Sequence, residues 1–398
     1  MLRPVAISTW CLAAFVGYFA VGSHAAAQER AKAAANQPAA DQPAAEKPAD
    51  PYAVPDGTPE QIMEFLDRLQ NQRRGFANRR EAVEHAIKIQ RARIQAGDKI
   101  LAQQTDDETA YDAAEMKLQA LALLASAGID GAHKEALAAA DVLKQDKRQD
   151  IADLARQVIK SLRIMVAPEM EPEERNALIR EILAEVKQRG TGTAVGAAME
   201  LGQALEGMSD TTVAADYYDQ LAALLKDSRH PQLRQLANML TATVRRLRLP
   251  GNTMEVTGTT LDGKPFDWSQ YRGKVVLVDF WATWCGPCRA ELPNIKKNYE
   301  RFHAKGFEVV GISADDDREK LVAFLENEQI PWVNLFEPPK DGEPAPQPTA
   351  EHYGVNAIPT AILVDRDGKV VSLNARGETL GQLLEKLLSA EKPGSKPE

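Results

Sequence analysis

The sequence predicts two folded domains: an all-α helical bundle or solenoid-like domain, followed by an α/β domain in which helices flank a mixed central sheet. Apolar residues recur at helical spacing over residues 58–249, which predicts the first domain. Pro250-Gly251 then ends the last helix, and short β-rich runs alternate with helices over residues 250–391. At 398 residues the chain is long enough for both domains.

The first 27 residues are typical of an export signal. Arg3 precedes a largely apolar run from Val5 to Gly22, and Ala25-Ala26-Ala27 provides an A-x-A cleavage pattern. We expect a signal peptide at residues 1–27, which directs the protein to the periplasm or cell envelope. An uncleaved membrane anchor is the alternative, because the apolar run approaches the length that spans a bilayer.

Two segments lack the apolar residues that a fold needs. Residues 28–57 consist mainly of alanine, proline, glutamine and charged residues, and residues 392–398 are polar. Such compositions cannot bury enough surface to offset the entropy of ordering the chain. We expect a disordered linker at 28–57 and a polar tail at 392–398.

Residues 58–249 predict eight or nine helices in helix-turn-helix pairs. Thr58-Pro59-Glu60 is typical of a helix start, and Ile62, Leu66 and Leu69 follow at helical spacing. No fixed period is strong enough to indicate tetratricopeptide repeats, so an irregular bundle or solenoid is expected. The region contains no cysteine or tryptophan. Its role is therefore open, and binding of a protein partner is one candidate.

From Pro250 onward, alternating elements predict a sheet of mixed direction with a terminal hairpin. Turns are expected at Asp262-Gly263 and at residues 365–368. The expected strands are 254–260, 275–280, 308–313, 332–335, 360–364 and 369–373, and the expected helices are 285–304, 316–327 and 380–390.

The charge excludes some classes of partner. The chain has 48 basic and 57 acidic residues, a formal net charge of −9. This balance disfavours nonspecific nucleic-acid binding and a polybasic contact with membranes. No nucleic-acid partner is expected.

The cysteines indicate redox chemistry. If the signal peptide is removed, Cys11 is lost and only Cys285 and Cys288 remain. A single pair in an exported protein of this size is not a structural disulfide framework. The pair follows an apolar strand at the expected start of a helix, where the helix dipole stabilises a thiolate on Cys285. The spacing therefore predicts a dithiol–disulfide switch.

Residues 249–388 resemble the thioredoxin superfamily, and most closely its exported TlpA/ResA-like thiol-disulfide oxidoreductases. The resemblance rests on several separate segments, so it is far more specific than a lone C-x-x-C. These segments are Asp279-Phe280-Trp281-Ala282-Thr283-Trp284-Cys285-Gly286-Pro287-Cys288 with Arg289-Ala290-Glu291-Leu292-Pro293 after it, Asp262-Gly263-Lys264, Gly273-Lys274 and Ile358-Pro359-Thr360.

The resemblance implies roles for four residues. Cys285 is the exposed nucleophile, and Cys288, one turn further along the helix, is shielded and resolves the mixed disulfide. Asp279 matches the buried carboxylate of thioredoxins, whose raised pKa lets it take a proton from Cys288. Glu291 matches a carboxylate of the TlpA/ResA branch. Which of the two acids is the main base stays open.

The resemblance also implies how a substrate binds. Pro359 is expected to be cis, which places the backbone of Ile358 beside the sulfurs, where it can pair with an extended substrate segment. Gly286 and Pro287 lie between the cysteines, and Trp284 is expected at the rim. Trp281 is expected in the core.

Three other functions are alternatives to thiol-disulfide exchange. A peroxiredoxin-like thiol peroxidase shares the fold, but Thr283 lies two residues before Cys285, whereas that family requires its threonine three residues before. A helical partner-binding protein with an accessory redox domain would explain the size of the helical region. A zinc site would need four ligands, and no other cysteine accompanies the pair. We expect neither a metal nor a cofactor.

The combined expectation is an exported thiol-disulfide oxidoreductase that reduces disulfides of client proteins. The Gly286-Pro287 dipeptide between the cysteines resembles that of the reducing members of the superfamily. A membrane thiol electron donor would restore the dithiol, and apocytochrome c is the client that the resemblance suggests. Physiological substrate, direction of exchange and oligomeric state are not encoded in any motif.

Overall fold

The computed structural model describes residues 50–72, 75–190, 192–339 and 347–389. The chain divides into two units, residues 1–53 and residues 54–398. The predicted signal peptide, the linker up to residue 49 and the polar tail lie outside the described residues. No helix within the described ranges is long and apolar enough to cross a membrane.

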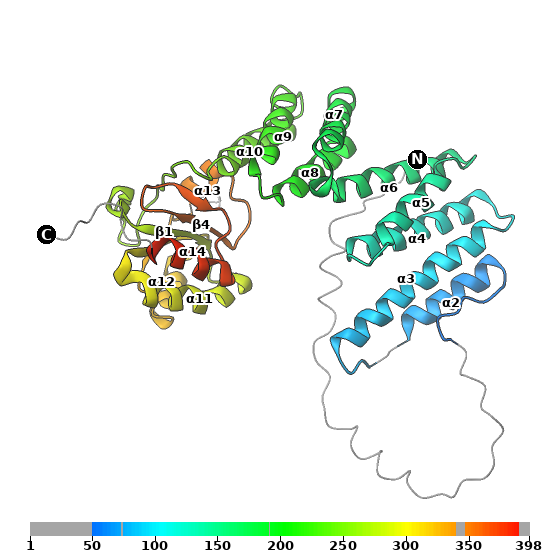
Figure 1. The fold of residues 1–398 in the computed structure, drawn as a ribbon, viewed down its shortest axis with the longest axis horizontal. Coiled ribbons are helices and arrows are strands. Elements are labelled where there is room, and N and C mark those ends of the chain that lie inside the picture. The colour runs from blue at the N-terminus through cyan, green and yellow to red at the C-terminus, as the bar shows by residue number, and fades with distance from the viewer. Residues whose placement is uncertain (1–49, 73–74, 191, 340–346, 390–398) are drawn as a thin grey trace, which may run out of the picture. The chain divides into compact units, whose positions relative to one another are not determined.

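The described part of residues 59–247 is helical, as predicted (Figure 1). Consecutive helices pack against each other along the chain. The α-helices are α2 (Pro59–Asn71), α3 (Arg79–Leu101), α4 (Asp107–Ser126), α5 (Ala132–Leu143), α6 (Gln149–Met165), α7 (Pro172–Arg189), α8 (Gly192–Glu206), α9 (Thr211–Leu225) and α10 (Pro231–Leu247), with the 3-10 helix η2 (Ala167–Glu169) between α6 and α7.

The helical region holds two successive hydrophobic clusters. One gathers side chains of α3–α6, and the next gathers side chains from the end of α6 through α10. Packing is tight where α8 meets α9, because a Cβ at Gly202 would lie 2.2 Å from Cε1 of Tyr218. The Tyr218 hydroxyl donates to Glu206, which also pairs with Arg246 of α10.

The end of the predicted linker is ordered against α3. Val54 is buried, its carbonyl accepts a hydrogen bond from Nζ of Lys99, and that ammonium also pairs with Asp56. The Gly57 carbonyl accepts from Gln103. Residues 54–57 therefore differ from the disorder expected for 28–57, because the neighbouring helix supplies partners for their backbone.

The second region contains a sheet of mixed direction, as predicted. It has five strands, in the order β3-β2-β1-β4-β5. The central strand β1 is buried along its whole length, which its apolar sequence anticipated. It pairs parallel with β2 and antiparallel with β4. The strands are β1 (Val275–Trp281), β2 (Phe307–Ser313), β3 (Val333–Leu335), β4 (Thr360–Val364) and β5 (Val370–Ser372).

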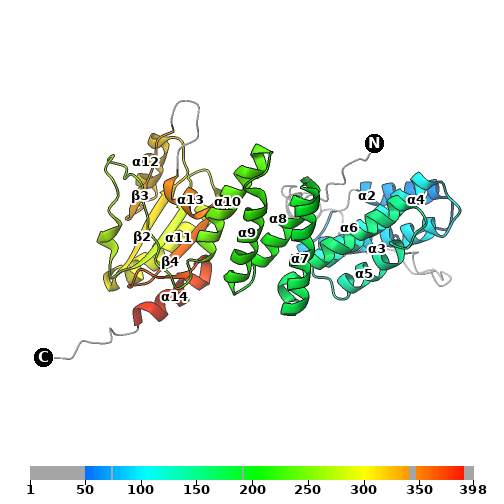
Figure 2. The ribbon, with the colours of Figure 1, turned by 90° about the horizontal axis from the view of Figure 1, so that it is seen from above.

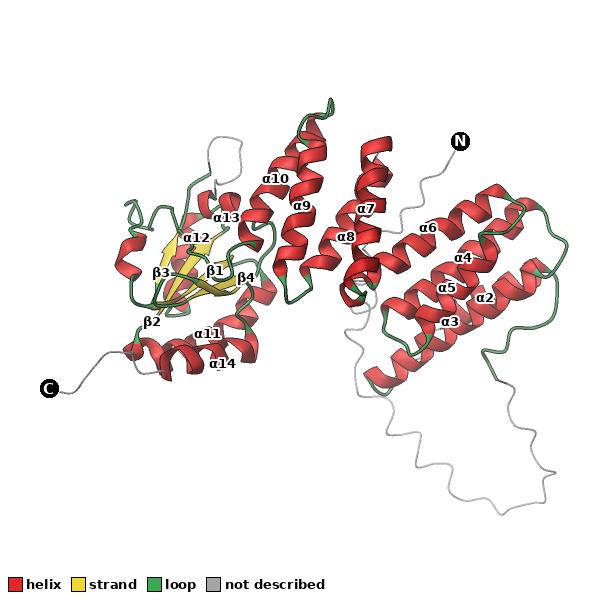
Figure 3. Ribbon diagram, turned by 45° about the horizontal axis from the view of Figure 1, so that its top comes forward, coloured by secondary structure: helices red, strands yellow, loops and turns green. Residues whose placement is uncertain are grey.

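Helices cover both faces of the sheet (Figure 3). On one face, α11 (Gly286–Phe302) and α14 (Gly377–Ser389) pack against the odd-numbered residues of β1. On the other face, α13 (Pro348–Tyr353) and residues 249–256 pack against the even-numbered residues. The remaining α-helix of this region, α12 (Arg318–Asn327), follows β2, and the 3-10 helices η3 (Trp268–Tyr271) and η4 (His303–Lys305) precede β1 and β2.

The strand predicted at 254–260 is wrong. The segment forms only isolated bridges at Thr259 and Thr260 and crosses one face of the sheet. Side chains of α13 satisfy its backbone instead, because Tyr353 accepts from the amide of Glu255 and Thr349 accepts from that of Thr257. Helix α13 was itself missed, since no helix was expected between the predicted strands at 332–335 and 360–364.

The last helix of the helical region contacts the second region directly. Helices α10 and α13 pack together (Figure 2). Gly354, at φ +60°, lies so close that an added Cβ would be 2.5 Å from the amide nitrogen of Thr243. Arg245 donates to the carbonyl of His352 at 3.0 Å.

Candidate active site

The two cysteines lie at the junction of β1 and α11. Cys285 is the N-cap of α11, and its Sγ accepts a hydrogen bond from the Cys288 amide at 3.2 Å. A disulfide joins the two residues, whose Cα atoms are 5.3 Å apart. The unpaired N–H groups of the first turn favour negative charge on the Cys285 sulfur when the bond opens. Pro287 occupies this first turn, where its missing N–H removes no helical bond.

The expected exposure of Cys285 is wrong. Cys285 is only 5% exposed and Cys288 3%. Both belong to a small apolar cluster with Trp281, Leu321 and Phe336, which pack around the disulfide. The motif predicted that the sulfur lies at the helix start, but it did not predict the covering side chains, which come from α12 and from the residue that follows β3.

The two tryptophans of the motif behave as predicted. Trp281 is 1% exposed in the core, and its Nε1 donates to Asn334. Trp284 is 67% exposed, next to the buried disulfide. Gly286 and Pro287 are also exposed, and nothing lies within 4 Å of a Cβ added at Gly286. The surface over the first turn of α11 is therefore open.

The peptide bond between Ile358 and Pro359 is cis, as predicted. These residues precede β4, whose first residue Thr360 pairs with Phe280, the last residue but one of β1. The half-buried side chain of Ile358 packs against the cluster that contains both cysteines. The fold thus brings together two segments of the motif that lie more than 70 residues apart in the sequence.

Asp279 lies in the middle of β1 and is 5% exposed. Burial raises its pKa from 3.8 to about 7; the negative charge of Glu291 adds to the rise and Arg376 opposes it. As an odd-numbered residue of β1, it is on the face covered by α11. It can therefore exchange a proton near neutral pH on the side of the sheet that carries the cysteines.

Glu291 is in a different environment. Its Oε1 accepts hydrogen bonds from the Gly377 amide at 2.8 Å and from Nδ2 of Asn294 at 2.6 Å. The same Asn294 nitrogen donates to the Gly377 carbonyl at 3.0 Å. Glu291 therefore ties α11 to the first residue of α14, which gives it a structural function in addition to its charge.

Two residues near the site were not anticipated. Arg376, in the loop before α14, acts on Asp279, although no sequence motif connects them. Asp315, after β2, accepts hydrogen bonds from both the amide and the hydroxyl of Thr283. The sequence offered one signal for Asp315. It is a polar residue shortly after β2, and because β1 and β2 are parallel, the residues that follow them meet at the same edge of the sheet.

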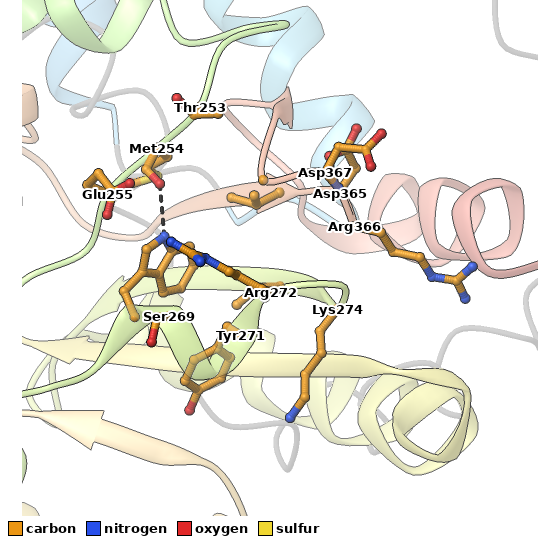
Figure 4. A pocket seen from close by; sticks show the side chains of 14 residues that line it. Thr253, Met254, Glu255, Ser269, Tyr271, Arg272, Lys274, Asp365, Arg366 and Asp367 are labelled. Carbon is orange, nitrogen blue, oxygen red and sulfur yellow. Dashed lines mark hydrogen bonds between the residues drawn. The ribbon is translucent and has the colours of Figure 1, made fainter. Parts of the chain in front are cut away.

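A cavity of about 380 Å³ lies at the other end of the sheet (Figure 4). Its lining includes Val276 and Val364, which pair near the start of β1. Trp281 ends the same strand five residues later, roughly 16 Å away at about 3.3 Å per residue. Neither cysteine lines this cavity, so it is separate from the redox site. Within the described ranges, no group of three or more His, Cys, Asp or Glu residues is arranged to hold a metal ion.

Comparisons with known proteins agree with this geometry. The family model described as Redoxin matches residues 248–386. Thiol-disulfide oxidoreductase ResA of Bacillus thuringiensis subsp. konkukian (strain 97-27) is 32% identical over 135 residues, which are 34% of this chain and 73% of that protein. ResA of Bacillus subtilis (strain 168) is 26% identical over 133 residues, 33% of this chain and 70% of that protein.

Among solved structures, the thioredoxin domain of a thiol-disulfide oxidoreductase from Bacteroides vulgatus is 34% identical; the match covers 35% of this chain and 97% of that one, with a TM-score of 0.32. The sequence matches and the cysteine pair joined by a disulfide at a helix start confirm the predicted family and reaction class. The chain belongs to the TlpA/ResA-like thiol-disulfide oxidoreductases of the thioredoxin superfamily.

Proposed function

We propose that this protein is an exported reductase of disulfides in client proteins. The observation that carries the proposal is the cysteine pair at the start of α11, on the face of β1 that also bears a carboxyl group with a pKa of about 7. Export rests on the sequence of residues 1–27.

In the proposed reaction, the reduced pair gives two electrons to the client. The Cys285 thiolate attacks one sulfur of the client disulfide; a mixed disulfide forms and the other client sulfur leaves as a thiolate, which takes up a proton. Cys288 then loses its proton and attacks the Cys285 sulfur. The second client thiolate leaves and is protonated, and the pair ends as the disulfide seen here.

Asp279 is the proposed base for Cys288. A group whose pKa is about 7 is half deprotonated at neutral pH, so it can accept the proton and return it. Glu291 is already used as an acceptor by Gly377 and Asn294. We therefore assign proton transfer to Asp279, and assign to Glu291 the positioning of α11 and the charge that helps to raise the Asp279 pKa.

Clients are proposed to bind at the open surface over the first turn of α11. The exposed Trp284 offers an apolar contact, and Gly286 and Pro287 leave room for an approaching chain. The backbone of Ile358, before the cis Pro359, would pair with an extended client segment. The relatives named above are oxidoreductases of thiols and disulfides, which supports client proteins that contain disulfides.

Turnover requires a partner that reduces the disulfide again. For an exported protein we propose a membrane thiol electron donor, with apocytochrome c as a client by family resemblance. The helical region, which is joined to α13 through α10, would bind a protein partner or fix the location of the enzyme.

Trapping the mixed disulfide tests the proposal. In Cys288→Ser the first attack proceeds but resolution cannot, so clients should be recovered as mixed disulfides through Cys285. The matched control Cys285→Ser should trap none. Absence of trapped clients in Cys288→Ser, or equal trapping by both variants, would contradict the assignment of Cys285 as nucleophile.

A further inference from the structure

A buried carboxylate that the exchange reaction does not use lies beside the active-site turn. Asp315 follows the last residue of β2 by two positions and is 3% exposed. Its hydrogen bonds come from the uncharged groups of Thr283 and Ser313. Burying a carboxylate costs free energy unless it is paired or hydrogen-bonded. The burial of Asp315 without a cationic partner among these bonds therefore suggests a role for the residue.

The carboxylate holds Thr283 at two points. Oδ1 accepts the Thr283 hydroxyl at 2.5 Å, and Oδ2 accepts the Thr283 amide at 3.0 Å. From the other side, the Ser313 hydroxyl donates to Oδ2 at 2.8 Å and accepts the Asp315 amide at 3.1 Å. The end of β2 thus fixes Asp315, and Asp315 fixes Thr283.

The sheet explains how residues 32 positions apart come to meet. Strands β1 and β2 are parallel, and Trp281 pairs with Ser313 at their ends. The Ala314 amide still donates to the Trp281 carbonyl at 2.8 Å. The two loops therefore leave the sheet side by side, which puts Asp315 level with Thr283.

Thr283 belongs to the turn that carries the nucleophile. The Cys285 amide donates to the Ala282 carbonyl at 3.2 Å, and the Cys285 sulfur accepts from the Cys288 amide at 3.2 Å. In the oxidised protein the disulfide itself keeps the sulfur in place. Once that bond opens, the position of the sulfur at the N–H groups of the helix depends on the turn, together with the side chains that pack around the cysteines.

We propose that Asp315 is a positioning residue for the nucleophile: by holding Thr283 it fixes the turn of residues 282–285, and so keeps the Cys285 sulfur at the start of α11 in the reduced enzyme. The inference rests on the proposed role of Cys285. It assigns a function to the buried carboxylate that the motif itself does not contain.

A positioning role of Asp315 and a purely electrostatic role predict opposite changes in the Cys285 pKa when Asp315 is replaced. A negative charge near a thiol disfavours the thiolate, so if only the charge mattered, its removal would lower the Cys285 pKa. If the hydrogen bonds to Thr283 matter, their loss moves the sulfur away from the helix N-terminus and raises the Cys285 pKa. Thr283→Val removes one bond and keeps the charge, whereas Asp315→Asn removes the charge and keeps an oxygen for the Thr283 amide.

The experiment measures alkylation of the reduced full-length protein by iodoacetamide as a function of pH, with each cysteine followed by mass spectrometry. We expect Asp315→Ala and Thr283→Val to raise the Cys285 pKa and to slow its alkylation at neutral pH by roughly tenfold, the loss of thiolate that a rise of about one pKa unit produces. Thr283→Ser and Asp315→Asn should remain within about threefold of the parent, less than the change that half a pKa unit produces in the thiolate fraction. A serine at 283 keeps both the amide and the hydroxyl as donors, and an asparagine at 315 can accept from the Thr283 amide and donate to the Thr283 hydroxyl, whereas Thr283→Val loses the hydroxyl bond altogether. Denaturation of the same samples verifies that each is folded.

The outcomes separate the two proposals. If Cys285 of the parent is alkylated first but all variants match it, or if Asp315→Ala lowers the Cys285 pKa, the positioning role is overturned while the nucleophile assignment stands. If Cys288 of the parent reacts first, the proposed function itself fails. Should Asp315→Ala not fold, the comparison of Thr283→Val with Thr283→Ser decides.

Discussion

Replacing Asp279 by asparagine should make the redox domain more stable at high pH and less active. Folding raises the pKa of this carboxyl from 3.8 to about 7, chiefly through burial. Between these two values the folded protein holds a proton that the unfolded chain has lost, so the free energy of unfolding falls as pH rises across this window and levels off above it.

The size of the effect follows from the pKa. A rise from 3.8 to about 7 corresponds to roughly 4 kcal/mol at about 1.4 kcal/mol per tenfold change in the proton equilibrium. Asp279→Asn cannot ionise, so its advantage over the parent should grow by up to roughly 4 kcal/mol between pH 4 and pH 8. The amide must still find partners in the core, and that cost is the same at both pH values.

Denaturation of the oxidised protein at pH 4, 6 and 8, followed by tryptophan fluorescence, measures this difference. Of the five tryptophans, Trp10 lies in the expected signal peptide, the helical region has none, and Trp268, Trp281, Trp284 and Trp332 all lie in the redox domain. In protein without residues 1–27, the fluorescence therefore reports the relevant domain. Asp316→Asn, at an exposed position of the same domain, is the matched control for the aspartate-to-asparagine change itself. An equal difference between Asp279→Asn and parent at pH 4 and 8 would refute the reasoning.

Loss of the proton acceptor should also slow disulfide exchange at neutral pH. General-base catalysis contributes roughly a hundredfold or more, so a decrease of this order is expected for Asp279→Asn in a stopped-flow assay with a disulfide substrate. An unchanged rate together with the stability gain would show that Asp279 is buried and protonated but is not the base.

Three further predictions concern single contacts. Gly202→Ala should lower the stability of the helical region by roughly 2 kcal/mol or more, because the added Cβ would lie 2.2 Å from the Tyr218 ring. The control Gly196→Ala, on the same helix, has no atom within 4 Å of its added Cβ and should stabilise the region by up to about 1 kcal/mol. Circular dichroism during a urea titration measures both changes. Trp284→Ala should leave the melting temperature unchanged and raise KM for insulin reduction, since the indole is 67% exposed; a large fall in melting temperature would show that it belongs to the core. Glu291→Gln should lower the pKa of Asp279, because the negative charge of Glu291 helps to raise it. In a plot of exchange rate against pH, the fall in rate on the acidic side should therefore move to lower pH. An unmoved fall would exclude this coupling.

The active-site segment could be predicted from the sequence because its signals are local. The apolar run before the motif predicted a strand at 275–280, and β1 forms there and is buried throughout, as a strand of such apolar sequence requires. The helix start at the cysteines, the cis bond before Pro359 and the opposite environments of Trp281 and Trp284 were likewise correct. Each depends on spacing within a few residues or on a motif with a fixed geometry.

Other features depended on contacts that no local pattern contains. The expected strand at 254–260 has the right composition, but Thr349 and Tyr353, more than 90 residues later, supply its hydrogen-bond partners. Cys285 is covered by Leu321 and Phe336 from other elements. Composition alone could not show which neighbours would reach these positions.

The sequence by itself determined which groups carry the chemistry: a cysteine pair at the start of a helix and two carboxyl groups at fixed distances along the chain. Only the tertiary structure decided how those groups differ. Burial raises the pKa of Asp279 to about 7. Glu291 accepts a hydrogen bond from the Gly377 amide, 86 residues away, and Asp315 accepts one from the amide of Thr283 in the turn before Cys285. The physical reason is that solvation and hydrogen bonding depend on which segments fold next to one another, and such proximity is not a property of any single segment.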